Sequence, residues 1–115
     1  MTSKKNVPQA SYFDLLLDAV CAVDKQGRFV FVSAACERIF GYTPDELIGQ
    51  PMIELVHPAD RQRTLDAARE IMGGDPKLNF ENRYVRKDGG VEHILCSARW
   101  SQVDQLRNAV ARDNT

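Results

Sequence analysis

The sequence predicts an α+β domain in which short helices and one longer helix pack on one face of a five-stranded antiparallel sheet. Two neighbouring segments rich in strand-forming residues, 19–23 and 28–32, come first. Three further segments with strand character follow residue 76, and helical patterns with capping residues fill the chain between the two groups. Strands in two groups with helices between them are typical of a sheet whose helices lie on one side.

The length of 115 residues fits one domain, which we place at residues 11–115 after a polar segment at residues 1–10. The chain has 15 basic and 16 acidic residues and a formal net charge of −1. The basic residues are scattered among acids, so no nucleic-acid partner is indicated. The longest apolar run, residues 19–23, is far shorter than the ~18 residues of a membrane span, and the N-terminus has no signal-peptide pattern. We expect a cytoplasmic domain with no membrane contact in this segment.

Cysteine and histidine spacing indicates no metal site. Cys21, Cys36 and Cys96 are odd in number and have no CxxC spacing, so reduced core cysteines are expected. Cys36 and Cys96 could instead tune a pocket, although a buried thiol without a cationic neighbour is a weak nucleophile. His57 and His93 lie in no metal-binding motif.

The first elements have clear turn and capping signals. Ser11 can cap a short helix, and segments 19–23 and 28–32 form a hairpin through the turn at residues 24–27. Ser33 is a plausible N-cap for a helix over residues 34–40.

Glycines and prolines mark the helices that follow. Gly41 ends the helix over residues 34–40, and residues 43–46 form a capping box with proline at the first helical position. Gly49 ends that second short helix. Pro58 opens the longer helix, which Gly73 and Gly74 terminate. Its expected buried face consists of Leu65, Ala68, Ile71 and Met72.

The last third of the chain alternates with the period of strands. A strand from residue 77 and a turn at residues 87–90 form a hairpin with the next strand. In that next strand one face consists of Ile94, Cys96, Ala98 and Trp100. The last strand is expected at residues 106–112.

This order of elements resembles the PAS sensory-domain family. The segment VCAVDKQGRFVFVSAACERIFGYTPDELIG at residues 20–49 resembles the front half of a PAS domain. KDG at residues 87–89 and RDNT at residues 112–115 match later landmarks of that family, so the resemblance covers residues 11–115. It implies a core that is either solid or opens into a ligand pocket.

By this resemblance, one set of side chains would line a pocket: Phe31, Phe40, Leu47, Met52, Ile53, Leu65, Ile94, Cys96 and Trp100. A solid core is the first interpretation, because any domain of this size buries such residues for about 1.5–3 kcal/mol each. Arg83 matches a position that is often arginine in the family. It could bind an anionic ligand, or form a surface pair with Glu81 or Glu92.

The resemblance also restricts cofactors. Light-sensing flavin members have an adduct-forming cysteine in a GxNC motif, where this chain has Gly49-Gln50-Pro51-Met52, so that photochemistry is not expected. One haem-binding group has a proximal histidine in an RxxH stretch, where this chain has Arg61-Gln62-Arg63-Thr64. His57 is expected to be a surface cap. The ligand stays unknown, and noncovalent flavin, a small carboxylic acid and a fatty acid stay open.

RDNT differs from the family's usual Asp-Ile-Thr ending only by Asn114, so the resemblance assigns signal coupling to Asp113 and Thr115. It implies a sensory and interaction domain, excised from a bacterial-type histidine kinase or diguanylate cyclase/phosphodiesterase. Such a domain would form a homodimer, attach to an output module and catalyse nothing itself.

The alternative is a ligand-free dimerisation module, which pairs through the N-terminal helix and the outer sheet face. A free-standing enzyme is the weakest interpretation, because no catalytic motif is present.

Overall fold

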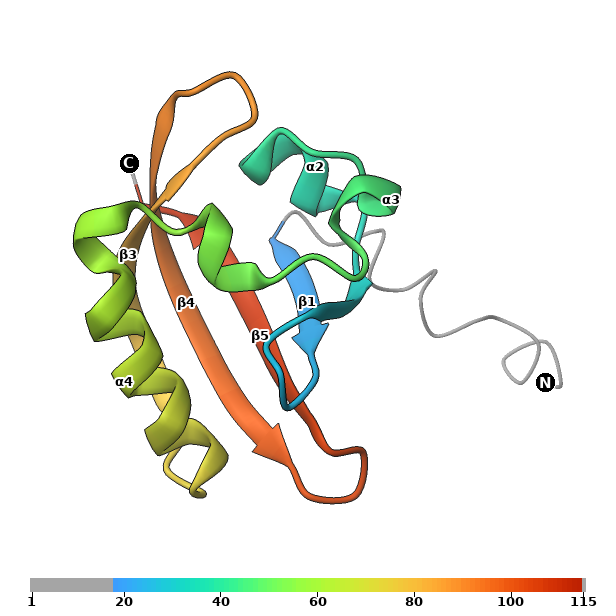
Figure 1. Ribbon diagram of the computed structural model, residues 1–115, viewed down its shortest axis with the longest axis vertical. Coiled ribbons are helices and arrows are strands. Elements are labelled where there is room, and N and C mark those ends of the chain that lie inside the picture. Colours follow the sequence, from blue (N-terminus) through green and yellow to red (C-terminus); the bar gives the residue numbers. More distant parts are fainter. Residues whose placement is uncertain (1–17, 115) are drawn as a thin grey trace, which may run out of the picture.

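The computed structural model describes residues 18–114, and the predicted Ser11 cap and Thr115 lie outside this range. Its centre is a five-stranded antiparallel sheet with the strand order β2-β1-β5-β4-β3 (Figure 1). The strands are β1 (Ala19–Val23), β2 (Phe29–Val32), β3 (Lys77–Val85), β4 (Val91–Ser101) and β5 (Leu106–Asp113). The predicted fold class is confirmed.

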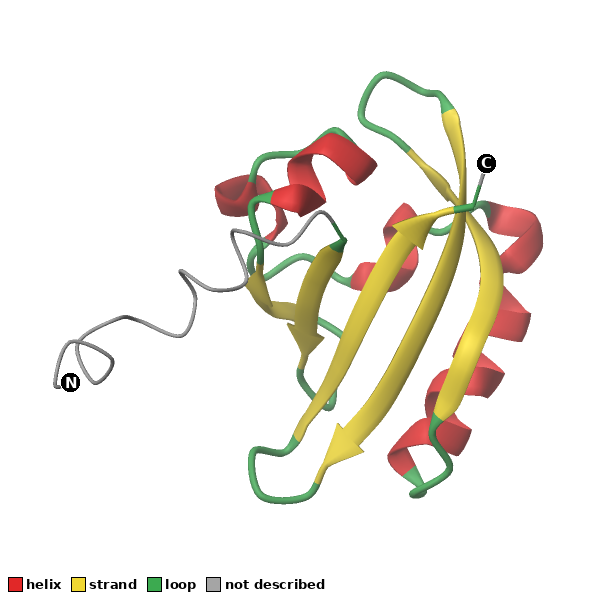
Figure 2. Ribbon diagram, turned by 180° about the vertical axis from the view of Figure 1, so that it is seen from behind, coloured by secondary structure: helices red, strands yellow, loops and turns green. Residues whose placement is uncertain are grey.

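The helices follow β2 in sequence. They are α2 (Ala35–Phe40), α3 (Pro44–Leu47), the 3-10 helices η2 (Met52–Leu55) and η3 (Pro58–Asp60), and α4 (Arg61–Met72). Helix α4 lies in front of β3 and β4 in Figure 1 and behind them in the reversed view of Figure 2. It therefore covers one face of the sheet, as predicted.

The β1–β2 hairpin forms where the sequence predicts it. The Asp24 side chain accepts hydrogen bonds from the backbone N–H groups of Gln26 and Arg28. Gly27 has a φ of 80°, a left-handed conformation that a residue without Cβ adopts without strain. Local turn chemistry thus favours this connection.

The role predicted for Ser33 is wrong. Helix α2 has Ala34 at its N-cap and no side-chain cap. The Ser33 hydroxyl instead accepts a hydrogen bond from the Val20 backbone N–H of β1, at 2.9 Å. Ser33 is fully buried. The Val20 backbone N–H in the sheet needs a hydrogen-bond acceptor, and the Ser33 hydroxyl supplies it. The Thr43–Glu46 capping box of α3 is confirmed in both of its hydrogen bonds.

The buried face of helix α4 matches the predicted one only in part. Ile71 is buried as predicted, but Leu65 is 40% exposed, and Thr64 and Ala67 are buried in its place. Ala68 and Met72 are half-buried. Thr64 can be buried because its hydroxyl donates to the Asp60 carbonyl and accepts from the Asn82 side-chain amide. These bonds hold the helix in a rotation that apolar periodicity alone does not reveal.

The core lies between the sheet and the helices. Its buried members are Ala19, Cys21, Val23, Phe29, Val32, Cys36, Ile39, Phe40, Leu47, Leu55, Val56, Tyr84, Ile94 and Ala111. Of the three free cysteines, Cys21 and Cys36 are buried, as predicted, and Cys96 is half-buried. Both edge strands, β2 and β3, contribute side chains to this one cluster, so the described residues form a single packed unit.

Candidate functional site

A buried arginine lies on the helix-facing side of the sheet. Arg107 of β5 is 6% exposed and lies between Val23 of β1 and Trp100 of β4 in the strand register. Directly opposed residues of antiparallel strands project to the same face, and Val23 belongs to the core. The Arg107 guanidinium therefore extends under the helices.

The guanidinium contacts two thioethers. Its two terminal nitrogens lie 3.8 Å from Met72 Sδ and 3.7 Å from Met52 Sδ. A thioether is a weak acceptor, whereas arginine has five N–H donors. Among residues 18–114, no carboxylate forms an ion pair with Arg107. The charge is thus buried without an anionic partner, an arrangement that typically costs about 3–5 kcal/mol.

The ionisable neighbours of Arg107 do not supply a counter-charge at neutral pH. Burial raises the pKa of the Cys96 thiol to about 11 and holds that of Cys21 well above its ordinary value. Burial also raises the pKa of Tyr84. Burial lowers the pKa of Arg107 itself, although arginine stays protonated in proteins. These groups remain neutral beside a cation.

A cavity of about 240 Å³ reaches this arginine. Its lining residues are Lys25, Gln26, Gly27, Pro51, Met52, Ile53, Thr64, Leu65, Ala68, Arg69, Met72 and Arg107. They come from the β1–β2 turn, from η2 and the residue before it, from α4 and from β5. Arg107 and Thr64 are buried, whereas Lys25, Gln26 and Arg69 are exposed. The cavity therefore runs from an exposed basic rim to a buried basic floor.

The structure separates the predicted pocket residues into groups. Met52, Ile53 and Leu65 line the cavity. Phe40, Leu47 and Ile94 belong to the solid core, and Cys96 packs against it. The predicted residues are therefore divided between the cavity wall and the packed core.

Two of the predicted lining residues have other surroundings. Phe31 pairs with Ala22 in the register, on the face of β1 opposite to core residues Cys21 and Val23, so its predicted place in the pocket wall is wrong. Trp100 is half-buried opposite Arg107, and its indole N–H donates to the Gln102 side chain.

No sequence motif singles out Arg107. The available signal is the alternation of β5, in which Arg107, Ala109 and Ala111 share one face. Two alanines beside a long side chain leave room over the middle of the sheet. The alternation shows this only when the buried face of the strand is known, and the sequence of residues 106–112 does not indicate which face is buried.

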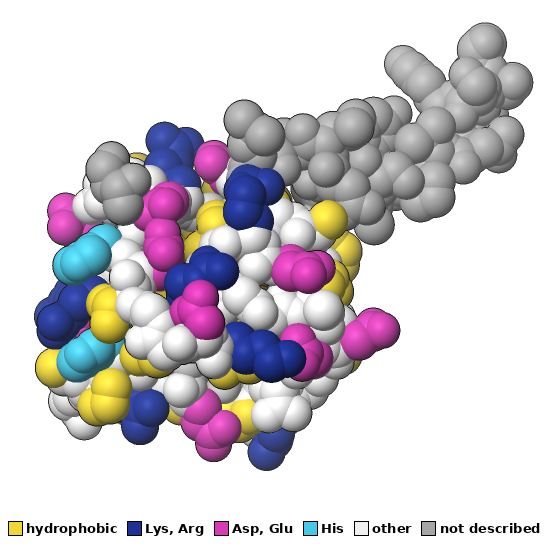
Figure 3. Space-filling model, turned by 90° about the horizontal axis from the view of Figure 1, so that it is seen from above, with side chains coloured by type: hydrophobic (Ala, Val, Ile, Leu, Met, Phe, Trp, Pro, Cys, Tyr) yellow, Lys and Arg dark blue, Asp and Glu magenta, His cyan; other side chains and the backbone are white. Residues whose placement is uncertain are grey.

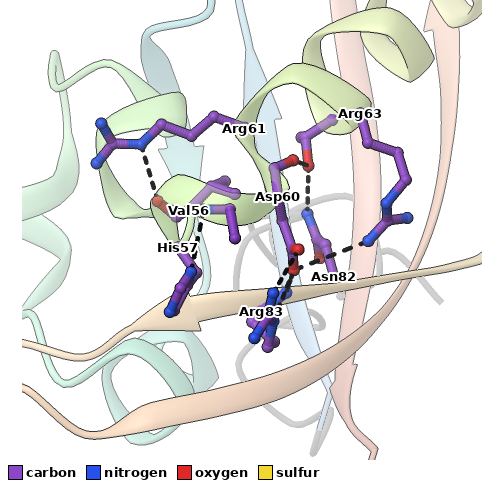
Figure 4. A network of polar contacts seen from close by, with 9 residues as sticks. Val56, His57, Asp60, Arg61, Arg63, Asn82 and Arg83 are labelled. Atoms are coloured by element: carbon purple, nitrogen blue, oxygen red, sulfur yellow. Dashed lines mark hydrogen bonds and ion pairs between the residues drawn. The ribbon is translucent and has the colours of Figure 1, made fainter.

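Arg83 has a partner inside the protein (Figure 4). Asp60 accepts from Arg83 Nε at 3.0 Å, from its terminal nitrogen at 2.8 Å and from its backbone N–H at 2.8 Å. The pairing predicted with Glu81 or Glu92 is therefore wrong, because the carboxylate comes from the start of α4. The hydrogen bonds from Arg83 hold the pKa of Asp60 well below its ordinary range. A second cavity of about 320 Å³ borders this pair.

His57 is the predicted cap. Its Nδ1 accepts from the Ala59 backbone N–H at the start of η3, and Arg61 Nε donates to the Val56 carbonyl beside it (Figure 4).

Within the described part of the chain, no cluster of His, Cys, Asp or Glu side chains is suited to hold a metal ion. No helix among residues 18–114 is long and apolar enough to cross a membrane.

The predicted coupling residue Asp113 lies at the end of β5, opposite Ile94. Glu92 precedes Ile94 by two residues, and the neighbouring Asp113 carboxylate raises the Glu92 pKa. The Asn114 N–H donates to the His93 carbonyl, which holds the chain against β4 just after Asp113. The chain therefore leaves the sheet beside a pair of acidic side chains.

The outer surface differs in charge from the cavity. Figure 3 shows basic and acidic side chains interspersed over one face of the molecule. In contrast, every charged residue that lines the cavity is basic: Lys25, Arg69 and Arg107. The cavity thus concentrates positive charge in a molecule with a formal net charge of −1.

Comparison with known proteins places the chain in a family. The model of a family described as "PAS fold" matches residues 29–109. An uncharacterised protein of Azorhizobium caulinodans is 43% identical over 84 residues, which cover 68% of this chain and 11% of that protein. The chain spans between 8% and 16% of the length of the four curated relatives considered.

Solved structures share the fold. A PAS domain from Colwellia psychrerythraea is 26% identical with a TM-score of 0.80, covering 100% of this chain and 98% of that one. A domain of a sensory box sensor histidine kinase/response regulator from Geobacter sulfurreducens is 23% identical with a TM-score of 0.80, covering 97% and 94%.

Proposed function

This chain belongs to the PAS family, and we propose that it is the sensory and interaction domain of a larger, cytoplasmic, bacterial-type signalling protein. Its output module would be a histidine kinase or a diguanylate cyclase/phosphodiesterase, joined to the C-terminal side of the domain. Similarity to a domain of a sensor histidine kinase/response regulator supports this class of protein. The domain would act by binding a small molecule and not by catalysis.

One observation carries the sensory role. The cavity of about 240 Å³ ends at a buried arginine without an anionic partner among the described residues. A buried charge without a partner is costly, and evolution commonly retains such a cost at functional sites. A bound molecule that supplies the missing interaction would stabilise the arrangement that contains it.

The proposed mechanism uses differential binding. Met52 of η2 and Met72 of α4 contact Arg107, so the cavity joins two helical elements to β5. The same strand ends at Asp113, where the chain leaves the sheet. A ligand that binds one packing of helices and sheet more tightly than another would shift the position of this exit. Equal binding to both packings would transmit nothing.

We propose that the domain itself is not an enzyme. Its three cysteine thiols, Cys21, Cys36 and Cys96, have pKa values raised by burial. Thiols of this kind are protonated at neutral pH and react slowly.

The first test is the mass of the purified chain under native and denaturing conditions. A small molecule retained in the native state and lost on denaturation supports sensing and begins to identify the ligand. A dimer without added mass, and without binding in a subsequent ligand screen, would contradict the sensory role.

A ligand-free dimerisation module is the second candidate, and the outer sheet face favours it. Val110 is 40% exposed on β5 and pairs with Val20 of β1, next to the Ala22–Phe31 pair. An apolar strip of this kind can serve as an isologous interface. Light scattering of the chain and of a Val110→Glu variant tests this candidate: a dimer that becomes a monomer supports it, and an unchanged mass contradicts it.

A further inference from the structure

We propose that the cavity above Arg107 binds a small molecule with one carboxylate on an apolar body, and that the carboxylate pairs with Arg107. This inference rests on the proposed sensory function and specifies the chemical class of its ligand.

The charge of the site requires an anion. Arg107 is only 6% exposed, and among residues 18–114 its terminal nitrogens have only the Met52 and Met72 thioethers as hydrogen-bond partners. The planar guanidinium matches a carboxylate with two parallel hydrogen bonds. Methionine side chains are flexible, so both thioethers can move aside as a ligand enters. Lys25 at the rim would attract the same charge, whereas Arg69 at the rim already pairs with Asp66.

The lining favours a single negative charge on an apolar molecule. Between rim and floor lie mainly apolar side chains: Pro51, Met52, Ile53, Leu65, Ala68 and Met72. An anion with two charges on one group, such as phosphate, would bring one uncompensated charge to the floor, where burial without a partner is unfavourable. A monocarboxylate neutralises Arg107 and leaves its apolar body against these side chains.

The volume guides the choice of probe. The cavity of about 240 Å³ is below the roughly 300–1,000 Å³ of most drug-sized pockets. Hexanoate, a short carboxylate with an apolar chain, is therefore a suitable probe.

The test uses calorimetry and thermal unfolding of the whole 115-residue chain with hexanoate, hexanamide and inorganic phosphate. Hexanamide has the same shape without the charge. Hexanoate should bind at least about tenfold more tightly than hexanamide, the factor for losing one charge-assisted hydrogen bond, and should raise the melting temperature. Phosphate should not compete with it.

Variants of one strand provide the controls. Arg107→Met should lose at least about tenfold in hexanoate affinity, and Arg107→Lys should retain part of it because it keeps the charge without the planar fork. Arg112→Met is the matched control, since Arg112 is exposed on β5 and pairs with Asp18 at the surface. If Arg107→Met does not fold, the Nε–Hε resonance of Arg107 in the native chain should shift on addition of hexanoate.

The outcomes separate this inference from the proposed function. Equal affinity for hexanoate and hexanamide, unchanged affinity in Arg107→Met, or binding of phosphate alone would each overturn the carboxylate site. Binding of neutral molecules that does not depend on Arg107 would still leave a small-molecule sensor. If no probe binds and native mass measurement finds no retained molecule, both the carboxylate site and the sensory role are wrong.

Discussion

Asp60 and Arg83 connect the start of the longest helix to the edge strand through three hydrogen bonds from one arginine to one carboxylate. Asp60 is 7% exposed, while the Arg83 side chain is 36% exposed. The same carboxylate binds the Arg83 backbone, so the pair fixes the position of the strand as well as of the side chain. This geometry makes the pair a structural clamp between α4 and β3.

We expect Asp60→Asn to lower the free energy of unfolding by about 1–3 kcal/mol, because charge-assisted hydrogen bonds from Arg83 are weakened or lost. Urea denaturation measures this change. Asp66→Asn is the control, since Asp66 pairs with Arg69 on the exposed side of the same helix and should change stability by less than about 0.5 kcal/mol. Equal effects of the two substitutions would contradict a clamp.

The clamp should also make stability depend on acid pH. Arg83 hydrogen bonds lower the folded-state pKa of Asp60 below its unfolded value of about 3.9. A carboxyl with a depressed pKa contributes stability above the unfolded value, and this contribution is lost as pH falls through the folded value. The stability difference between native chain and Asp60→Asn should therefore be largest near pH 7 and shrink below about pH 4. A difference that stays constant down to pH 2 would rule this out.

Ser33 gives a second stability prediction. Its hydroxyl accepts the Val20 N–H from a fully buried position, whereas the Thr43 hydroxyl caps α3 at an exposed one. Ser33→Ala should cost about 1–3 kcal/mol, because a sheet N–H loses its acceptor away from water. Thr43→Ala should cost about 1 kcal/mol, the usual value of an N-cap. A larger loss for Thr43→Ala in thermal or urea unfolding would contradict this order.

The sequence patterns predict the helices and strands better than they predict the contacts between those elements. The hairpin of β1 and β2, the α3 capping box and the C-terminal end of α4 follow from nearby residues, so they were predicted correctly. Pro58 opens the 3-10 helix η3, and α4 itself begins only at Arg61. Ser33 and Arg83 have partners 13 and 23 positions away, and no local pattern identifies such partners.

The candidate site shows the same limit. The resemblance to PAS domains implied that Met52, Ile53 and Leu65 would lie near a pocket, and all three line the cavity. The resemblance does not show which face of β2 is buried in this chain, so Phe31 was misplaced. The sequence does not identify Arg107 as a site residue, because its buried guanidinium is distinguished by the lack of an anionic partner. Only the three-dimensional contacts reveal that lack.

Trp100 is expected to contribute less to stability than a fully buried aromatic residue. It is half-buried at the end of β4, whereas Phe29 is 1% exposed in the core. Phe29→Ala should cost about 3–5 kcal/mol, and Trp100→Ala about 1–3 kcal/mol. Urea unfolding of both variants compares them, and a Trp100→Ala cost equal to that of Phe29→Ala would place the indole in the core.

The exit from the sheet provides the last prediction. The Asp113 carboxylate and partial burial raise the pKa of Glu92, so the folded domain binds a proton at Glu92 more readily than the unfolded chain does. The stability from this proton is present at low pH and is lost as pH rises through the folded pKa, because two adjacent carboxylates then repel each other.

Asp113→Asn removes one of these charges and should lower the Glu92 pKa, which a ¹³C NMR titration of the Glu92 carboxyl measures. Asp104→Asn is the control, because Asp104 lies in the β4–β5 turn at the opposite end of both strands. An unchanged Glu92 pKa in Asp113→Asn would show that the two carboxylates do not interact. In a signalling protein that carries this domain, the substitution should keep the fold and weaken the coupling of ligand to output, because it alters contacts only where β5 leaves the sheet.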